Sequence, residues 1–124
     1  HLHCRGLSHG DIYAHNILVE EKGGDSGERV LIRTRSKLSD FGAASFASFL
    51  HPKQVSLLEK VEVRAFGCLV EELTDRIVGE GEETAAVVGQ LRDLQKRTRM
   101  DEVHTRPSFF DVHVELTGLL NRMK

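Results

Sequence analysis

Three polar residues, Asp11, Asn16 and Asp40, have the types and the spacing that phosphoryl transfer requires. Five positions separate Asp11 from Asn16, and Asp40 follows later, directly before a Phe-Gly pair. One carboxylate can orient a nucleophilic hydroxyl and accept its proton, while an amide oxygen and a second carboxylate hold Mg²⁺ against the phosphates. The pattern therefore predicts a metal-assisted site at which a phosphoryl group is transferred.

The composition excludes several classes of function. The chain has 124 residues, the size of one domain, with 40% hydrophobic and 29% charged residues, which is ordinary for a globular protein. A net charge of −2 gives no electrostatic basis for binding nucleic acid or an acidic membrane. No apolar run approaches the ~20 residues that span a bilayer, and two cysteines do not form a disulfide framework. We therefore expect a cytoplasmic protein that binds neither nucleic acid nor membrane.

Short strands are predicted in the first third of the chain, where they position the polar residues. Residues 17–20 are apolar and β-branched, which predicts a strand that leads away from Asn16. Residues 30–32 predict a second strand after a glycine-containing turn at 21–28, and residues 37–39 a third strand that delivers Asp40. Residues 43–56 lack clear periodicity and are expected to be largely loop.

Helices are predicted in the rest of the chain. From residue 62 to residue 77 apolar residues recur at helical spacing, which predicts an amphipathic helix that is buried on most sides up to Leu73. A second helix is expected over about 83–97, and a third after Pro107 with Ser108 as its N-cap. This order predicts a mainly α (α+β) fold, in which a small β-hairpin carries the catalytic and metal-binding loops.

Four landmarks occur in a fixed order along the chain. They are His9-Gly10-Asp11 with Asn16, Lys37-Leu38-Ser39-Asp40-Phe41-Gly42, Glu62-Val63-Arg64-Ala65-Phe66-Gly67, and Arg106-Pro107-Ser108-Phe109. Together they resemble the C-terminal lobe of the eukaryotic-type protein kinase family, over residues 3 to about 120. The glycine-rich lid and the strand lysine of that family have no counterpart in this sequence. The resemblance thus implies one partial domain over residues 1–124, a C-lobe fragment without the N-lobe.

The resemblance implies roles in catalysis for two residues. Asp11 would be the catalytic base that orients the acceptor hydroxyl. His9 would stack on Phe41 in the hydrophobic column of an assembled active state. Glu62 stands where the family usually has an Asp, which holds the backbone of the catalytic loop from below.

The resemblance also implies a cofactor, Mg-ATP. Asn16 and Asp40 would hold Mg²⁺, and Leu18, followed by Val19, would form the floor under the adenine ring. The implied activity is transfer of the γ-phosphoryl group to protein hydroxyls in the intact chain, with an N-lobe that the parent chain supplies. The fragment alone would be inactive, and it would expose Leu18, Val19 and Phe41 to solvent.

The sequence also departs from the protein kinase pattern. Gly10 replaces the Arg that usually precedes the catalytic Asp, so this position offers no cation to a phosphorylated activation loop. Tyr13 and His15 stand where the family has a cation. The segment before Glu62 is too short for a full activation segment, so the usual carboxylate partner of Arg106 is missing, and Glu59 is the expected replacement.

Three other interpretations remain open at this point. Small-molecule kinases of the aminoglycoside and choline kinase type also carry His-Gly-Asp, followed by an Asn five residues after the Asp, and Gly10 matches them better. A pseudokinase that serves as an interaction module would explain the missing cation. Asp11 and Asn16 could also be a capping and turn pair without chemistry.

Overall fold

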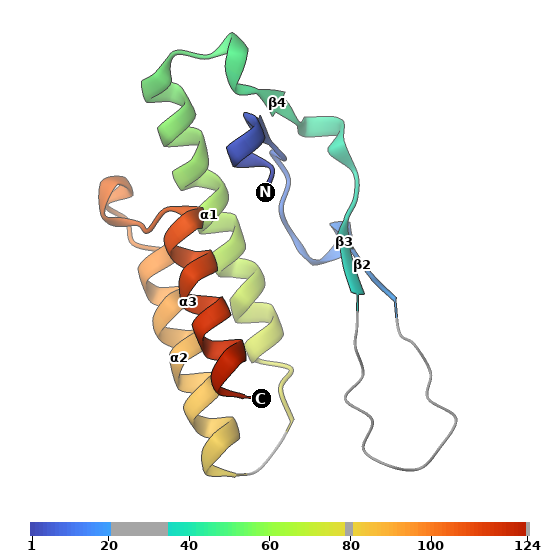
Figure 1. Cartoon of the computed structure of the whole chain (residues 1–124), viewed down its shortest axis with the longest axis vertical. Helices are drawn as coiled ribbons and strands as arrows, with labels where there is room; N and C mark the ends of the chain where they lie inside the picture. Colours follow the sequence, from blue (N-terminus) through green and yellow to red (C-terminus); the bar gives the residue numbers. More distant parts are fainter. Residues whose placement is uncertain (21–34, 79–80, 124) are drawn as a thin grey trace.

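Three long helices form most of the structure, a computed structural model that describes residues 1–20, 35–78 and 81–123. Helix α1 spans Pro52–Thr74, α2 spans Glu82–Thr98 and α3 spans Phe109–Arg122. Helices α1 and α2 run antiparallel along their length, and α3 lies beside them (Figure 1). Within these ranges no helix is both long and apolar enough to cross a membrane. The expectation of a mainly helical fold with a small β component is confirmed.

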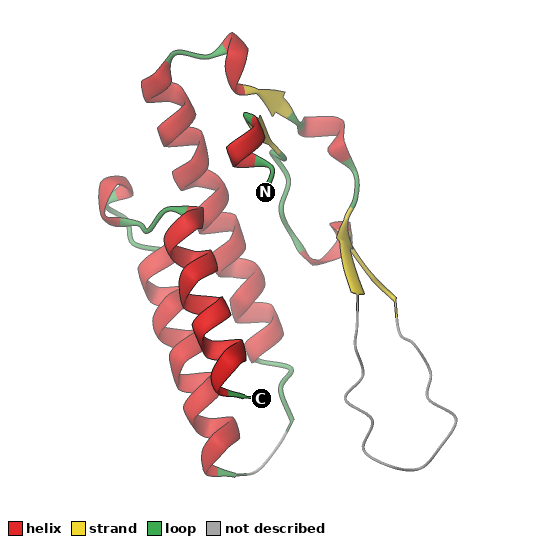
Figure 2. Cartoon of the chain, viewed as in Figure 1, coloured by secondary structure: helices red, strands yellow, loops and turns green. Residues whose placement is uncertain are grey.

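Two small antiparallel sheets lie on one side of the helices (Figure 2). Strand β1 (Leu7–Ser8) pairs with β4 (Ser45–Phe46), and β2 (Ile17–Glu20) pairs with β3 (Arg35–Leu38). The predicted strand at 17–20 and the strand that delivers Asp40 are both present. The strand expected at 30–32 and the turn expected at 21–28 lie outside the described residues.

Helix α1 begins ten residues before its predicted start at Glu62, and the expectation of a loop as far as residue 56 is wrong. His51 caps the helix, since its Nδ1 accepts the Lys53 N–H at 3.3 Å, and Gln54 Oε1 accepts the His51 N–H at 2.8 Å. Pro52 occupies the first helical position, where no N–H is needed. These capping residues start the helix in a segment whose apolar residues show no helical period.

The core lies where the helices face one another. Leu73 is 55% exposed, so the expectation that α1 is buried on most sides up to this residue is wrong at its C-terminal end. The prediction of Ser108 as the N-cap of α3 is confirmed, because its Oγ accepts the Asp111 N–H at 3.2 Å. The buried apolar side chains come from all three helices: Val63, Leu69, Val70, Leu94, Val112 and Leu119.

Helix α1 lies close to the C-terminal end of α2 at Gly67. A Cβ atom at this position would stand 2.3 Å from Thr98 Oγ1 and 2.9 Å from Arg99 Cγ. Thr98 is fully buried, and its Oγ1 donates to the Leu94 carbonyl at 3.0 Å, so it has little freedom to move. The absence of a side chain at residue 67 therefore sets the spacing of the two helices.

We predict that Gly67→Ala destabilises the chain by about 1–3 kcal/mol, because the added methyl group overlaps Thr98. Gly89→Ala is the matched control on α2, where a Cβ would meet nothing within 4 Å. This control should stabilise the chain by about 0.5–1 kcal/mol through helix propensity alone. Urea denaturation of the three proteins measures both effects, and equal stability of the two variants would contradict the close approach.

Candidate active site

Asp11 and Asn16 lie in direct contact. The Asn16 Nδ2 group donates to the Asp11 backbone carbonyl at 2.9 Å and to Asp11 Oδ2 at 3.0 Å. Asn16 is buried in the short turn Ala14–Asn16, whereas Asp11 is exposed. Asn16 Oδ1 accepts no hydrogen bond from the described residues. The side-chain amide of Asn16 thus orients the Asp11 carboxylate.

Ser39, the residue before Asp40, is hydrogen-bonded to the loop that carries Asp11 and Asn16. Ser39 donates to the Asn16 carbonyl twice, from its backbone N–H at 2.8 Å and from its Oγ at 3.0 Å. Asp40 itself has φ 58°, the one positive φ outside glycine in the part of the chain described. Its Oδ1 accepts the Gly42 N–H at 3.2 Å. A left-handed non-glycine residue costs about 1–2 kcal/mol, and such strain is concentrated at functional sites.

His9 is fully buried between these two segments. Its Nε2 donates to the Ser39 carbonyl at 2.9 Å, and its Nδ1 accepts the Asp11 N–H at 3.3 Å. Its ring meets Phe41 edge-on, with the ring centroids 4.7 Å apart. The predicted contact of His9 with Phe41 is therefore present, and the imidazole links Asp11 to the segment that carries Asp40.

Glu62 holds this loop from α1. The carboxylate is 3% exposed, its Oε1 accepts the Gly10 N–H at 2.5 Å, and its Oε2 pairs with His3. Burial by itself raises the pKa of Glu62, but the hydrogen bonds from His3 and from the Gly10 N–H outweigh it and hold the pKa below its usual value. The contact that the resemblance implied between Glu62 and the backbone of the catalytic loop is present.

Gly10 is a glycine for structural reasons. It has φ +83°, and a Cβ atom would stand 2.3 Å from the Ala43 carbonyl oxygen and 2.9 Å from its carbon. An arginine at this position would therefore meet both backbone strain and a collision with backbone atoms. The conformation of the loop therefore favours glycine over the arginine of the protein kinase pattern at this position.

The apolar residues that the resemblance led us to expect on the surface are exposed. Leu18 is 57% exposed and Val19 59% exposed on β2, and Phe41 is 45% exposed. The rings of Tyr13 and His15 are both exposed and lie 5.3 Å apart, so they form a pair beside Asn16. The predicted exposure of the apolar residues on this face is confirmed.

The donor atoms fit Mg²⁺, which takes few protein oxygens because it keeps several of its waters. Asn16 Oδ1 and the Asp40 carboxylate supply one amide oxygen and one acidic group on two linked segments. Over residues 1–20, 35–78 and 81–123, no three His, Cys, Asp or Glu side chains are grouped so that they could hold a metal ion. Asn16 and Asp40 remain the Mg²⁺ ligands that the sequence predicts.

Arg106 does not pair with Glu59, so this prediction was wrong. Arg106 is buried, and it donates from Nε to the Met100 carbonyl at 2.7 Å and from Nη1 to the Lys60 carbonyl at 3.1 Å. Glu59 Oε1 accepts the Phe109 N–H at 2.9 Å instead. The first N–H groups of a helix lack intrahelical partners, so Glu59 stabilises the start of α3.

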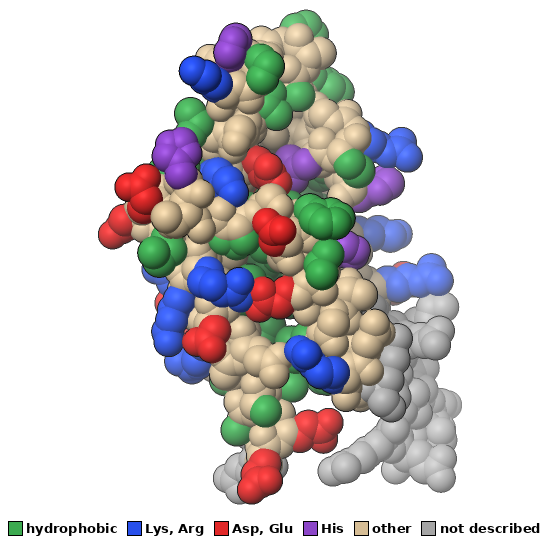
Figure 3. All heavy atoms as spheres, turned by 60° about the vertical axis from the view of Figure 1, so that its left-hand side comes forward, with side chains coloured by type: hydrophobic (Ala, Val, Ile, Leu, Met, Phe, Trp, Pro, Cys, Tyr) green, Lys and Arg blue, Asp and Glu red, His purple; other side chains and the backbone are tan. Residues whose placement is uncertain are grey.

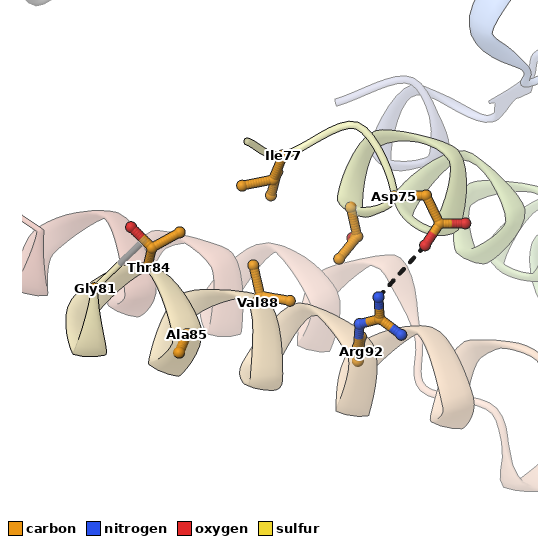
Figure 4. A pocket seen from close by; sticks show the side chains of 8 residues that line it. Asp75, Ile77, Gly81, Thr84, Ala85, Val88 and Arg92 are labelled. Carbon is orange, nitrogen blue, oxygen red and sulfur yellow. Dashed lines mark hydrogen bonds and ion pairs between the residues drawn. The ribbon is translucent and has the colours of Figure 1, made fainter. Parts of the chain in front are cut away.

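A separate cavity of about 480 Å³ lies between the end of α1 and the start of α2 (Figure 4). Arg92 crosses it to reach Asp75 at 3.5 Å, and Ile77 and Val88 contribute apolar surface. Thr74 on its lining is about three helical turns beyond Glu62. The cavity contains none of the predicted site residues.

The sequence matches no protein-family model and no curated protein. The functional interpretation therefore depends on the contacts of the described residues. These contacts bring Asp11, Asn16, His9 and the segment of Asp40 together, and they leave Leu18 on an open face. The predictions from sequence missed His3, although its position six residues before His9 places it near the same loop.

We predict that Gly10→Ala destabilises the chain by about 3 kcal/mol, from the positive φ together with the overlap on Ala43. Gly6→Ala is the matched control, since Gly6 has φ +69° but its Cβ would lie 3.5 Å from the nearest atom, an ordinary contact. The control should cost only about 1–2 kcal/mol. Thermal and urea unfolding measure the difference, and a smaller cost at Gly10 than at Gly6 would contradict the contact.

We predict that the charge of Glu62 makes the stability depend on pH. Because its pKa is lower in the folded chain than in the unfolded chain, the ionised form stabilises the fold above about pH 4.3, the pKa of an unperturbed glutamate. This contribution is lost as the pH falls through the lower pKa of the folded state. Urea midpoints at a series of acidic pH values should therefore fall more steeply for the wild type than for Glu62→Gln. Parallel curves would refute the prediction.

Proposed function

We propose that the chain is the catalytic lobe of a cytoplasmic protein-kinase-like phosphotransferase, which uses Mg-ATP to phosphorylate protein hydroxyl groups. One observation carries the proposal: hydrogen bonds join the Asp11 carboxylate, Asn16 and the segment before Asp40 into one unit, and α1 anchors that unit through Glu62. Such fixed positioning of a base and two metal-binding oxygens supports phosphoryl transfer, in which the protein contributes mainly orientation and electrostatics.

Asp11 would act as the base. Asn16 occupies Oδ2 of the exposed carboxylate, which leaves Oδ1 available to the hydroxyl group of an acceptor. The backbone N–H of Asp11 is bound to His9, and the neighbouring Gly10 N–H is bound to Glu62, so the loop cannot easily rotate the carboxylate away. A base held in this way contributes to the rate through orientation as well as proton transfer.

Asn16 and Asp40 would hold Mg²⁺, which when bound neutralises charge on the phosphates. Asp11 accepts both hydrogen bonds from the Asn16 Nδ2 group, so Oδ1 would be the atom of this amide that binds the metal. Asp40 follows β3 and accepts the Gly42 N–H through Oδ1, so Oδ2 would be the oxygen of this carboxylate that binds the metal.

The open apolar face supports a second lobe as a partner. Leu18, Val19 and Phe41 are each exposed, and as successive residues of β2 Leu18 and Val19 project to opposite faces of the small sheet. Exposed apolar side chains next to a polar site are compatible with a cover from another part of a protein. An N-lobe that the parent chain supplies would close the nucleotide site over these three residues.

A small-molecule kinase of the aminoglycoside or choline kinase type is the second candidate. The contact between Gly10 and Ala43 favours it, because the loop has no space for the arginine of protein kinases and that family also carries glycine there. Both candidates share the roles of Asp11, Asn16 and Asp40, and they differ only in the acceptor.

Binding of Mg-ATP tests the shared part of the proposal. Titration calorimetry should show Mg²⁺-dependent ATP binding by the parent protein with its N-lobe, at least tenfold weakened by Asp40→Ala, which corresponds to about 1.4 kcal/mol. Asp75→Ala is the control, since Asp75 is an exposed carboxylate at the distant end of α1. The isolated chain should bind far more weakly, because its face at Leu18 is uncovered.

The outcomes separate the three interpretations. Binding that Asp40→Ala abolishes, followed by transfer of labelled phosphate to peptides, supports the protein kinase. Transfer to amino alcohols or aminoglycosides but not to peptides supports the second candidate. If both proteins are folded and neither binds Mg-ATP, the phosphotransferase proposal fails and an interaction module is the better interpretation.

A further inference from the structure

Ser39 uses all three of its hydrogen-bonding groups on the loop that carries Asp11 and Asn16. Its backbone N–H and its Oγ both donate to the Asn16 carbonyl, at 2.8 and 3.0 Å, and its own carbonyl accepts a bond from His9 Nε2 at 2.9 Å. A carbonyl oxygen has two lone pairs, so Ser39 alone fills both acceptor positions of the Asn16 carbonyl. Because Asp40 follows Ser39 directly, the residue before one proposed Mg²⁺ ligand is bound to the backbone of the other.

The hydroxyl of Ser39 adds a restraint to a bond that the β-ladder already provides. Ile17 pairs with Leu38, and the bond from the Ser39 N–H to the Asn16 carbonyl continues this ladder by one step. A single hydrogen bond leaves the two residues free to rotate about its axis, whereas a second donor on the same residue restricts that rotation. The hydroxyl therefore fixes the direction in which the chain leaves the ladder toward Asp40.

This direction matters because the backbone of Asp40 is strained. Its φ is 58°, and a left-handed residue other than glycine keeps such a conformation only where its surroundings determine it. The peptide that leads into Asp40 is held by the hydroxyl bond of Ser39 and by His9, and beyond it Asp40 Oδ1 accepts the Gly42 N–H at 3.2 Å. Loss of the hydroxyl bond would weaken the restraint on the side where the chain enters Asp40.

A site for Mg²⁺ is sensitive to such a loss, because this ion demands near-ideal octahedral geometry. A change in the separation of Asn16 and Asp40 would weaken metal binding even though both ligands remain. Groups that orient metal ligands typically change metal affinity by about 10–100-fold when they are removed.

We propose that the Ser39 hydroxyl is a positioning group of the candidate active site, which sets the separation of Asn16 and Asp40 by fixing the chain where it enters Asp40. For its significance to metal binding and phosphoryl transfer, this inference rests on the proposed function. The restraint itself can be measured in the chain without any nucleotide.

Three substitutions isolate the hydroxyl group. Ser39→Ala removes it, while Ser39→Thr and Ser39→Val give side chains of nearly the same shape, which differ by a hydroxyl against a methyl group. Hydrogen–deuterium exchange resolved by NMR should show the Ser39 amide exchanging about fivefold faster in the Ala and Val variants than in the wild type, the effect of one lost hydrogen bond. The Thr variant should stay within about twofold of the wild type. Ser36→Ala, at an exposed serine on the same strand, is the control and should change nothing.

Mn²⁺ serves as a paramagnetic probe of the metal site, since it also prefers octahedral oxygen ligands. In the wild type it should broaden the amide signals of Asn16 and Gly42, and Asp40→Ala should abolish the broadening at Gly42. The Ala and Val variants of Ser39 should need about tenfold more Mn²⁺ for the same broadening.

Competing sites for the probe are few. Among the residues that the structure describes, no three His, Cys, Asp or Glu side chains are grouped so that they could hold a metal ion. Figure 3 shows acidic side chains interspersed with basic ones on this face of the helices.

The outcomes distinguish this proposal from the proposed function. Unchanged exchange at Ser39 in the Ala and Val variants, or equal exchange in the Thr and Val variants, overturns the role of the hydroxyl, as does equal Mn²⁺ binding by all variants. An equal loss of protection at buried Leu69 of α1 would indicate global destabilisation and would overturn a local role. If Ser39→Ala fails to fold, the Thr and Val pair decides. If the exchange results hold but Mn²⁺ broadens neither amide in the wild type, the hydroxyl positions the chain and the metal site of the proposed function fails.

Discussion

The structure around the candidate active site depends on one buried carboxylate. Glu62 lies at the middle of α1, almost without exposure, and a charge in such a place is costly unless donors surround it. Its donors lie on two other segments and include His3 and the Gly10 N–H, so the requirement to compensate one charge brings three parts of the chain together. Helix α1 is itself held by its packing on α2 at Gly67, and it therefore transmits the rigidity of the helical body to the loop that carries Asp11.

Two residues with positive φ flank the same site, each held by a neighbouring contact, and the non-glycine one, Asp40, is strained. Gly10 adopts φ +83° against the Ala43 carbonyl and is fixed by Glu62, while Asp40 adopts φ 58° and follows the two bonds that Ser39 makes with Asn16. His9 lies between them and bonds to both segments. Strain of this kind persists only where surrounding interactions determine the conformation, so the close set of contacts is what allows Asp11 and Asp40 to be presented at fixed positions.

Much of this arrangement could be predicted from the sequence wherever local chemistry determined it. The strand at 17–20, the pairing of Asp11 with Asn16 and the Ser108 cap depend on residues close together in the chain. The start of α1 was missed because a His-Pro capping signal, and not apolar periodicity, begins that helix. The partners of Arg106 were missed because they are two backbone carbonyls, which cannot be recognised from residue types. Glu59 instead accepts a hydrogen bond from the first residue of α3.

The two sides of the site differ in how their groups are covered: one side has its polar atoms hydrogen-bonded, and the other exposes apolar side chains. This difference indicates how the site could operate. On the side of α1, the buried polar side-chain atoms all have partners, and the loop is anchored by a charge. On the side of β2, Leu18 and Val19 expose apolar surface close to Asn16, which directly precedes the strand. A polar group gains electrostatic strength when water is excluded from it. A cover over β2 would therefore strengthen the interactions of Asn16 and Asp40 without any rearrangement of the anchored side, so that closure of the site and binding of a phosphate ligand would reinforce each other.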